Sequence, residues 1–193
     1  MIARAAFRPL ALALVPDTTI ARLALVTGGS LVIALAAQVA VSLPFSPVPV
    51  TMQTYAVLVV AAALGRVAAA SVSLYILEGI VGLPVFAGGT SGIERLLGPT
   101  GGYLAGFIAA AFVVGMLAER GWERHALTAL AAMLAGELVI YALGLPWLAR
   151  FVPADRVLVL GLLPFIPGDL VKLVLAAATP LAAWRVIHPS PGG

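Results

Sequence analysis

The sequence predicts an all-α membrane protein that crosses the bilayer six times, with both chain ends in the cytoplasm. Three observations predict this fold class: a very apolar composition, six segments of near-spanning length and a one-sided distribution of arginines. Hydrophobic residues make up 62% and charged residues 10% of the 193 residues, against about 45–50% and about 25% in soluble domains. A soluble chain of this size cannot cover so much apolar surface with polar groups, so the lipid bilayer is its natural solvent.

Each predicted span approaches the roughly 20 apolar residues that a membrane-crossing helix needs. The six spans cover residues 20–43, 51–64, 67–81, 101–118, 126–143 and 167–187. Only Gly65 and Arg66 separate the second from the third, which predicts a tight hairpin. We expect a single membrane domain: a cytoplasmic or interfacial arm (1–19), a six-helix bundle (20–187) and a cytoplasmic tail (188–193).

An additional apolar segment, residues 157–166, precedes the last span and is too short to cross the bilayer. Pro164 and Pro167 punctuate it. Backbone that does not span is tolerated at membrane depth where protein buries it. We therefore predict a re-entrant or capping segment, with fusion into one long bent helix with the last span as the alternative.

The arginines set the predicted orientation. With the N-terminus in the cytoplasm, seven arginines lie inside and three outside, as the positive-inside rule requires. The inside set is Arg4, Arg8, Arg22, Arg66, Arg120, Arg124 and Arg185, and the outside set is Arg95, Arg150 and Arg156. The long segments rich in Gly, Pro and aromatic residues then all lie outside, which favours capture of a ligand from that side.

Several function classes are excluded by the composition. The chain has no cysteine and two histidines, which excludes disulfides and thiolate metal sites and disfavours a histidine site. The arginines are scattered, so no nucleic-acid partner is predicted. No catalytic constellation or nucleotide-binding motif is present. We therefore predict neither an enzyme nor a resident cofactor, and any ATPase must be a separate chain.

The stretch PGDLVK (167–172) carries the main candidate for ligand binding. Asp169 follows Pro167 at the start of the last span, near the positive end of the helix. Lys172, the only lysine, lies at i+3 on the same face. Ionisable residues within spans indicate function, although a structural ion pair is the alternative. A carboxylate and an ammonium together suit a polar ring with N–H and carbonyl groups, such as a ureido ring.

Two glycine-rich stretches are further candidates. GPTGGY (98–103) opens the fourth span, where Gly101 and Gly102 expose backbone N–H groups and Tyr103 adds an aromatic face. GGTSG (88–92) has the same character through Gly88 and Gly89. A plain glycine-rich helix start is the alternative interpretation for both.

Other polar residues lie in apolar surroundings. Gln53, at the outer start of the second span, and Glu78, near the end of the third, are predicted to contact the ligand. Glu137, within the fifth span, is as compatible with structural packing as with a ligand contact. Arg95 lies in the largest outer loop, where a solvated charge is favoured over a contact with a ligand carboxylate.

Small residues mark one face of the first span. Ala24 and Gly28 have the small-xxx-small spacing that permits close helix approach in lipid. Docking of a partner membrane subunit is the functional interpretation, and packing within the bundle is the alternative.

Four motifs together resemble a known family. SPVPVTMQT (46–54), GLPVFAGGTSG (82–92), LLGPTGGYLAGF (96–107) and LPFIPGDLVK (163–172) are similar to the biotin-specific S components of energy-coupling-factor transporters, the BioY family. The resemblance implies a six-helix protein of the bacterial cell membrane that binds biotin near its outer face, through Asp169 and Lys172 with the glycine loop and Tyr103 as the pocket wall. It also implies a transmembrane coupling subunit, docked at Ala24 and Gly28, and two cytoplasmic ATPases.

Two other classes remain as alternatives. A stand-alone secondary transporter, with helices broken near Pro164 and Pro167, would couple uptake to protons or sodium, with Glu78 or Glu137 titrating. An intramembrane enzyme, such as a lipid-modifying hydrolase, would need a nucleophile–base pair that the sequence does not display.

Overall fold

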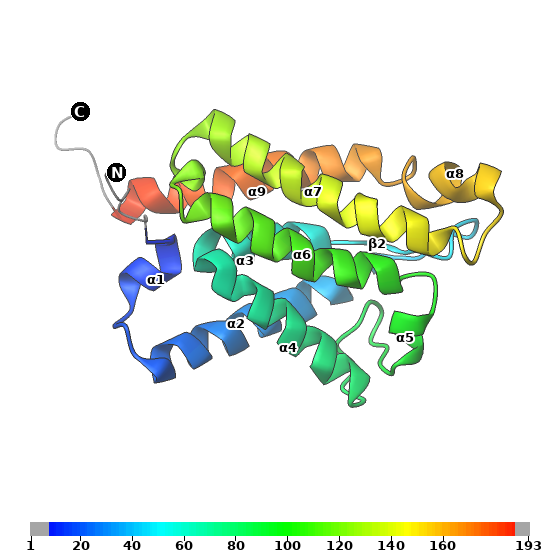
Figure 1. Cartoon of the computed structure of the whole chain (residues 1–193), viewed down its shortest axis with the longest axis horizontal. Coiled ribbons are helices and arrows are strands. Elements are labelled where there is room, and N and C mark those ends of the chain that lie inside the picture. Colours follow the sequence, from blue (N-terminus) through cyan, green and yellow to red (C-terminus); the bar gives the residue numbers. More distant parts are fainter. Residues whose placement is uncertain (1–7, 188–193) are drawn as a thin grey trace, which may run out of the picture.

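The structure is a computed structural model that describes residues 8–187. The predicted tail (188–193) and Arg4 lie outside the described residues. The described chain is almost entirely helical, and its longer helices form one elongated bundle (Figure 1). Helix α1 (Leu10–Leu14) and the end of α9 (Ile166–Ile187) lie at the same end of this bundle, where they contact each other (Figure 1).

Within residues 8–187, five helical stretches are long and apolar enough to cross a membrane. They are Thr19–Gln38, Gln53–Ile80, Gly101–Ala118, Ala126–Leu148 and Ile166–Ile187. The second stretch contains α3 (Gln53–Leu64), the 3-10 turn η1 (Gly65–Val67) and α4 (Ala68–Ile80). Gly65 has a φ of 65°, a left-handed conformation that glycine adopts without strain, and α3 and α4 diverge from it (Figure 1).

Helix α2 (Thr19–Gln38) ends five residues before the predicted end of the first span. The chain instead forms a short antiparallel pair of strands, β1 (Ala40–Val41) and β2 (Val50–Thr51). Ala40 pairs with Thr51, and the intervening loop holds the prolines of SPVPV. Backbone hydrogen bonds within this hairpin replace those of a further helical turn, and the hairpin delivers the chain directly into α3.

Helix α6 (Gly101–Ala118) has the predicted bounds, whereas α7 (Ala126–Leu148) is five residues longer than predicted and contains Pro146. The extra turns pack tightly on α6, because a Cβ at Gly144 would lie 2.5 Å from the Tyr103 ring. Trp147 Nε1 also donates a hydrogen bond to the Gly98 carbonyl at 2.8 Å. These contacts hold the helix beyond its proline.

The remaining short elements lie in the connections. They are α5 (Glu94–Leu97), η2 (Trp122–Arg124), η3 (Ala154–Arg156) and α8 (Val157–Gly161). Helix α8 occupies the apolar segment predicted before the last span, and four residues separate it from α9. The structure therefore has a distinct short helix here rather than one long fused helix.

The surface and the core are both apolar. The core is rich in small residues on α3 and α6, so that helices approach closely: a Cβ at Gly106 would lie 2.9 Å from the Ile140 backbone. Large aliphatic side chains such as Leu35, Leu138 and Val174 point outward and are about half exposed or more. An exposed apolar surface of this extent is that of a multi-pass membrane protein.

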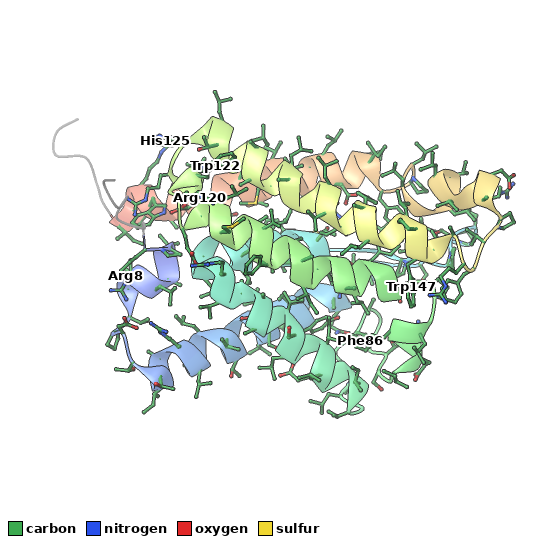
Figure 2. All side chains as sticks on the ribbon, in the orientation of Figure 1. Arg8, Phe86, Arg120, Trp122, His125 and Trp147 are labelled. Carbon is green, nitrogen blue, oxygen red and sulfur yellow. The ribbon has the colours of Figure 1, made fainter. Side chains whose placement is uncertain are left out.

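Arginines are more frequent at one end of the bundle than at the other. Arg8 and Arg120 lie at one end with Trp122 and His125, while Trp147 lies at the other (Figure 2). At the arginine-rich end, Arg66 Nε pairs with Glu119 Oε2 at 2.7 Å.

Candidate functional site

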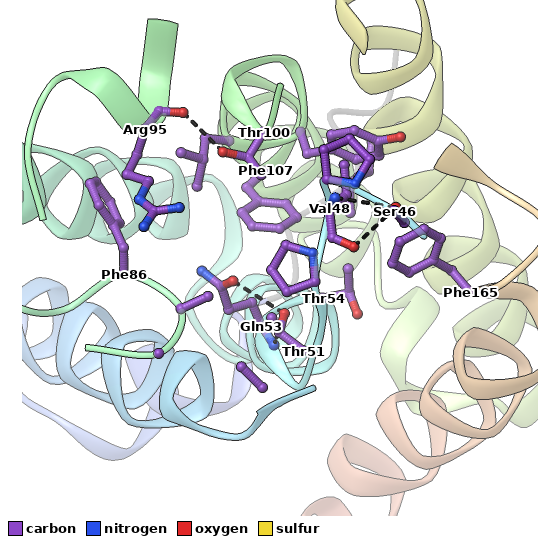
Figure 3. A pocket seen from close by; sticks show the side chains of 18 of the residues that line it. Ser46, Val48, Thr51, Gln53, Thr54, Phe86, Arg95, Thr100, Phe107 and Phe165 are labelled. Carbon is purple, nitrogen blue, oxygen red and sulfur yellow. Dashed lines mark hydrogen bonds between the residues drawn. The ribbon is translucent and has the colours of Figure 1, made fainter. Parts of the chain in front are cut away.

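A cavity of about 330 Å³ opens among the helices near the Trp147 end of the bundle. Residues from the β1–β2 hairpin, α3, the loop before α6, and helices α6, α7 and α9 line it, so distant parts of the chain build one site (Figure 3). Its volume is that of a site for a small organic molecule. Its polar side chains include Thr51, Gln53, Thr54, Arg95, Glu137, Tyr141, Asp169 and Lys172.

The predicted pair Asp169 and Lys172 is formed and lines this cavity. Lys172 Nζ lies 2.7 Å from Asp169 Oδ1, and the two side chains are only 9% and 8% exposed. Lys172 Nζ also donates hydrogen bonds of 3.0 Å to the Thr51 carbonyl and the Thr54 hydroxyl. Removing two charges from water is costly unless both are paired and hydrogen-bonded, and this network meets that condition.

Tyr141 completes the network from α7. Its hydroxyl donates a hydrogen bond to Asp169 Oδ2 on α9. Both carboxylate oxygens of Asp169 are therefore engaged, one by an ammonium and one by a phenol. Tyr141 was not predicted from the sequence, although it lies one helical turn from Glu137, and a polar aromatic residue on the same helix face as a buried acid is a usable signal.

Gln53 and Tyr103 both line the cavity, as expected, but their polar atoms are already bound within the protein. Gln53 Nε2 donates to the Tyr75 hydroxyl at 2.6 Å, and Gln53 Oε1 accepts from Thr51 Oγ1 at 3.1 Å. The Tyr103 hydroxyl donates to the Gly161 carbonyl at 2.8 Å. Tyr103 thus offers its ring as a wall, packed edge-on against Tyr141.

Only one of the four predicted glycines, Gly88, lines the cavity. Gly101 and Gly102 instead allow α6 to pack against its neighbours, since a Cβ at Gly101 would lie 1.7 Å from the Leu96 carbonyl oxygen and one at Gly102 would lie 2.3 Å from Trp147 Cβ. Gly88 and Gly89 have φ values of 69° and 70°, so they shape a turn that other residues rarely adopt.

The acidic residues separate into two locations. Glu78 is not among the residues that line the cavity, because its Oε2 accepts a hydrogen bond of 2.6 Å from Ser30 and links α4 to α2. Glu137 lines the cavity and is 7% exposed. Arg95, on the short helix α5, is exposed and also lines the cavity, a position that fits the contact with a ligand carboxylate considered from the sequence (Figure 3).

Apolar residues that were not predicted complete the wall. They come from the SPVPV loop, the loop between α4 and α5, helix α6 and the residue before α9: Pro47, Val48, Phe86, Phe107 and Phe165. Aromatic residues in membrane helices usually contact lipid or core, so sequence position alone gave no signal for Phe107.

The small-residue face of α2 is not used for packing within residues 8–187. Ala24 and Gly28 are exposed, and a Cβ at Gly28 would meet nothing within 4 Å. Gly29, by contrast, packs against Ser71 and Val60.

Comparison with known proteins agrees with this architecture. The BioY family model matches residues 10–189. The chain is 44% identical to the probable biotin transporter BioY of Pyrococcus horikoshii, over 72% of this chain and 82% of that protein. It is 45% identical to the biotin transporter BioY of Thermotoga maritima, over 71% and 81%. It is 36% identical to the biotin transporter BioY2 of Lactococcus lactis, over 89% and 94%.

A solved structure shares the fold. The crystal structure of the S-component for biotin from an ECF-type ABC transporter superposes with a TM-score of 0.78 at 24% identity, covering 88% of this chain and 95% of that one. Sequence motifs, helical architecture and the matching family model therefore agree: the chain belongs to the BioY family of membrane transport proteins.

Proposed function

We propose that this chain is the substrate-binding S component of a biotin importer, which captures biotin from the extracytoplasmic side and delivers it inward with a partner energising module. The observation that carries the proposal is the buried Asp169–Lys172 pair in a cavity of about 330 Å³. The similarity to proteins named biotin transporters supports the choice of ligand.

The cavity matches the chemistry of biotin. Biotin has a ureido ring with two N–H donors and a carbonyl acceptor, an apolar thioether ring, and a chain that ends in a carboxylate. Asp169 accepts from the ureido ring, and Lys172 donates to the ring carbonyl in exchange for one of its hydrogen bonds to the Thr51 carbonyl or the Thr54 hydroxyl. The ring of Tyr103 and its aromatic neighbours cover the apolar part, and Arg95, which reaches into the cavity from an outer loop, pairs with the carboxylate.

The topology that suits this function has six spans. Helices α3 and α4 each cross the membrane, both chain ends lie in the cytoplasm, and α8 caps the bundle on the outer side. The arginine-rich end then faces the cytoplasm of a bacterial cell. The cavity opens on the opposite, extracytoplasmic side of the cell membrane.

The energising module comprises a transmembrane coupling subunit and two cytoplasmic ATPases. The coupling subunit docks on the α2 face that carries Ala24 and Gly28, where exposed small residues allow another helix to approach closely. Reorientation of the loaded S component, driven by the ATPases, then releases biotin inside.

A binding titration tests the proposed ligand site. Purified protein freed of ligand is titrated with biotin by calorimetry, alongside Asp169→Asn and Lys172→Ala variants whose folding is checked by gel filtration. We expect saturable binding by the wild type and a loss of at least tenfold in each variant. Unchanged affinity in both variants would remove the site assignment.

A further inference from the structure

Glu137 is a buried acceptor that the proposed roles of Asp169 and Lys172 leave unused. It projects from α7 into the cavity lining, is 7% exposed, and its Oε1 is buried without a hydrogen-bond partner. Among the lining side chains of residues 8–187, it is the one with a buried oxygen or nitrogen that lacks a partner. An unsatisfied buried carboxyl oxygen costs free energy, so a site that keeps one is prepared for a donor.

The neighbouring polar groups do not supply that donor. The three N–H groups of Lys172 have three acceptors: Asp169, the Thr51 carbonyl and the Thr54 hydroxyl. The Tyr141 hydroxyl donates to Asp169. The ammonium of Lys172 and the hydroxyl of Tyr141 are thus already committed, and an N–H of the ligand is a suitable donor for Glu137 Oε1.

The charges of the cluster favour a neutral donor. Asp169 and Lys172 both act electrostatically on Glu137, in opposite directions, so their charges partly offset each other there. A hydrogen bond from a neutral N–H satisfies Glu137 Oε1 without adding a second buried cation, which would itself have to be desolvated.

A cyclic urea presents such donors in a geometry that one carboxylate cannot satisfy. Its two N–H bonds flank the carbonyl and diverge, so each needs an acceptor of its own. Asp169 on α9 supplies one acceptor, and Glu137 on the facing α7 supplies a second.

We propose that Glu137 is a ligand-contacting and specificity-determining residue that accepts one ureido N–H through Oε1, while Asp169 accepts the other. This inference rests on the proposed function, because it takes biotin as the ligand. The site should therefore prefer cyclic ureas that keep both N–H groups over rings in which one N–H group is replaced by another atom.

The test compares Glu137→Leu with the wild type against three ligands. These are biotin and its two cyclic carbamate analogues, in each of which a ring oxygen replaces one of the two ureido N–H groups. Leucine removes the acceptor at similar volume and suits a membrane helix. We expect the variant to bind biotin about 10- to 100-fold more weakly. With the carbamate that lacks the N–H facing Glu137, the variant should bind as well as the wild type.

Glu137→Gln keeps a carbonyl acceptor and should retain most of the biotin affinity, which also covers the case in which the leucine variant fails to fold. Glu78→Gln is the matched control, because Glu78 is a helix glutamate outside the cavity lining that is bound to Ser30. The biotin affinity of this variant should equal that of the wild type.

An equal loss for all three ligands in Glu137→Leu, or no loss for biotin, would overturn the role of Glu137 while leaving biotin binding by the wild type intact. Absence of biotin binding by the wild type would instead overturn the proposed function.

Discussion

Tyr141 on α7 donates a hydrogen bond to Asp169 on α9, so the two helices that face each other across the cavity are joined at the candidate binding pair. The bond orients the Asp169 carboxylate while Lys172 holds its other oxygen at 2.7 Å. The ligand therefore meets a carboxylate whose direction is fixed before binding, which lowers the entropy that binding has to overcome.

Tyr141→Phe should weaken biotin binding roughly 3- to 10-fold, because it removes one hydrogen bond to Asp169 and leaves the ring in place. Calorimetric titration measures the change. Tyr55→Phe is the matched control: its hydroxyl is 3.0 Å from Thr179 Oγ1, between α3 and α9 and away from the cavity lining. Equal affinities for wild type and Tyr141→Phe would mean that Asp169 needs no orienting partner.

Lys172→Met should destabilise the protein by about 3–5 kcal/mol, since it leaves the Asp169 carboxylate buried and unpaired. The double variant Asp169→Asn, Lys172→Met removes both charges and should recover a large part of that loss. Thermal unfolding in detergent compares the two. A double variant no more stable than the single one would contradict the view that an unpaired charge is the cause.

Gly102→Ala should cost about 1–3 kcal/mol of stability by forcing α6 away from α7, because the new Cβ would lie 2.3 Å from Trp147 Cβ. Gly28→Ala is the control: its Cβ would meet nothing within 4 Å, and alanine favours helix. Thermal unfolding should separate the two variants. Similar stabilities would contradict the observed α6–α7 contact.

Gly28→Leu should leave biotin binding unchanged and abolish uptake in cells that contain the energising module, because it obstructs the proposed docking face of α2. Ala131→Leu, at an exposed position of α7, makes a comparable addition of bulk on another face and should leave uptake unchanged. Normal uptake by Gly28→Leu would place the docking surface elsewhere.

Arg95→Gln should weaken biotin binding about tenfold and leave binding of the uncharged biotin amide unchanged, if the guanidinium pairs with the ligand carboxylate. Titration of both ligands against both proteins separates this contact from a general effect on the loop. A parallel loss for the amide would show that Arg95 acts on the shape of the cavity instead.

The sequence was sufficient for features that depend on local spacing. The bounds of α6 follow from the turn residues before Gly101 and the end of the apolar run at Ala118. The proximity of Asp169 and Lys172 follows from their i+3 separation on one helix. Helix α7 extends five residues beyond its predicted end, because contacts to α6 hold the helix past Pro146, where a proline would otherwise favour a break.

Features that depend on which helix faces which could not be predicted from spacing. Glu78 and Glu137 have similar apolar surroundings in the sequence, yet only Glu137 faces the cavity. The glycines of the α6 start have the composition of a ligand loop, but Gly102 packs against Trp147, about 45 residues further along the chain. The rotation of each helix about its axis decides which side chains face the cavity. Uniformly apolar helices carry no periodic pattern that reveals this rotation.

Ligand retention tests the central claim most directly. The protein is purified in mild detergent from cells supplied with vitamins, and the small molecules released on denaturation are identified by mass spectrometry. We predict biotin at about one molecule per protein chain for the wild type and its loss from Lys172→Ala. Absence of biotin from the wild type, together with no binding of added biotin to the ligand-free protein, would contradict the proposed function and leave a BioY-family membrane protein with a different ligand.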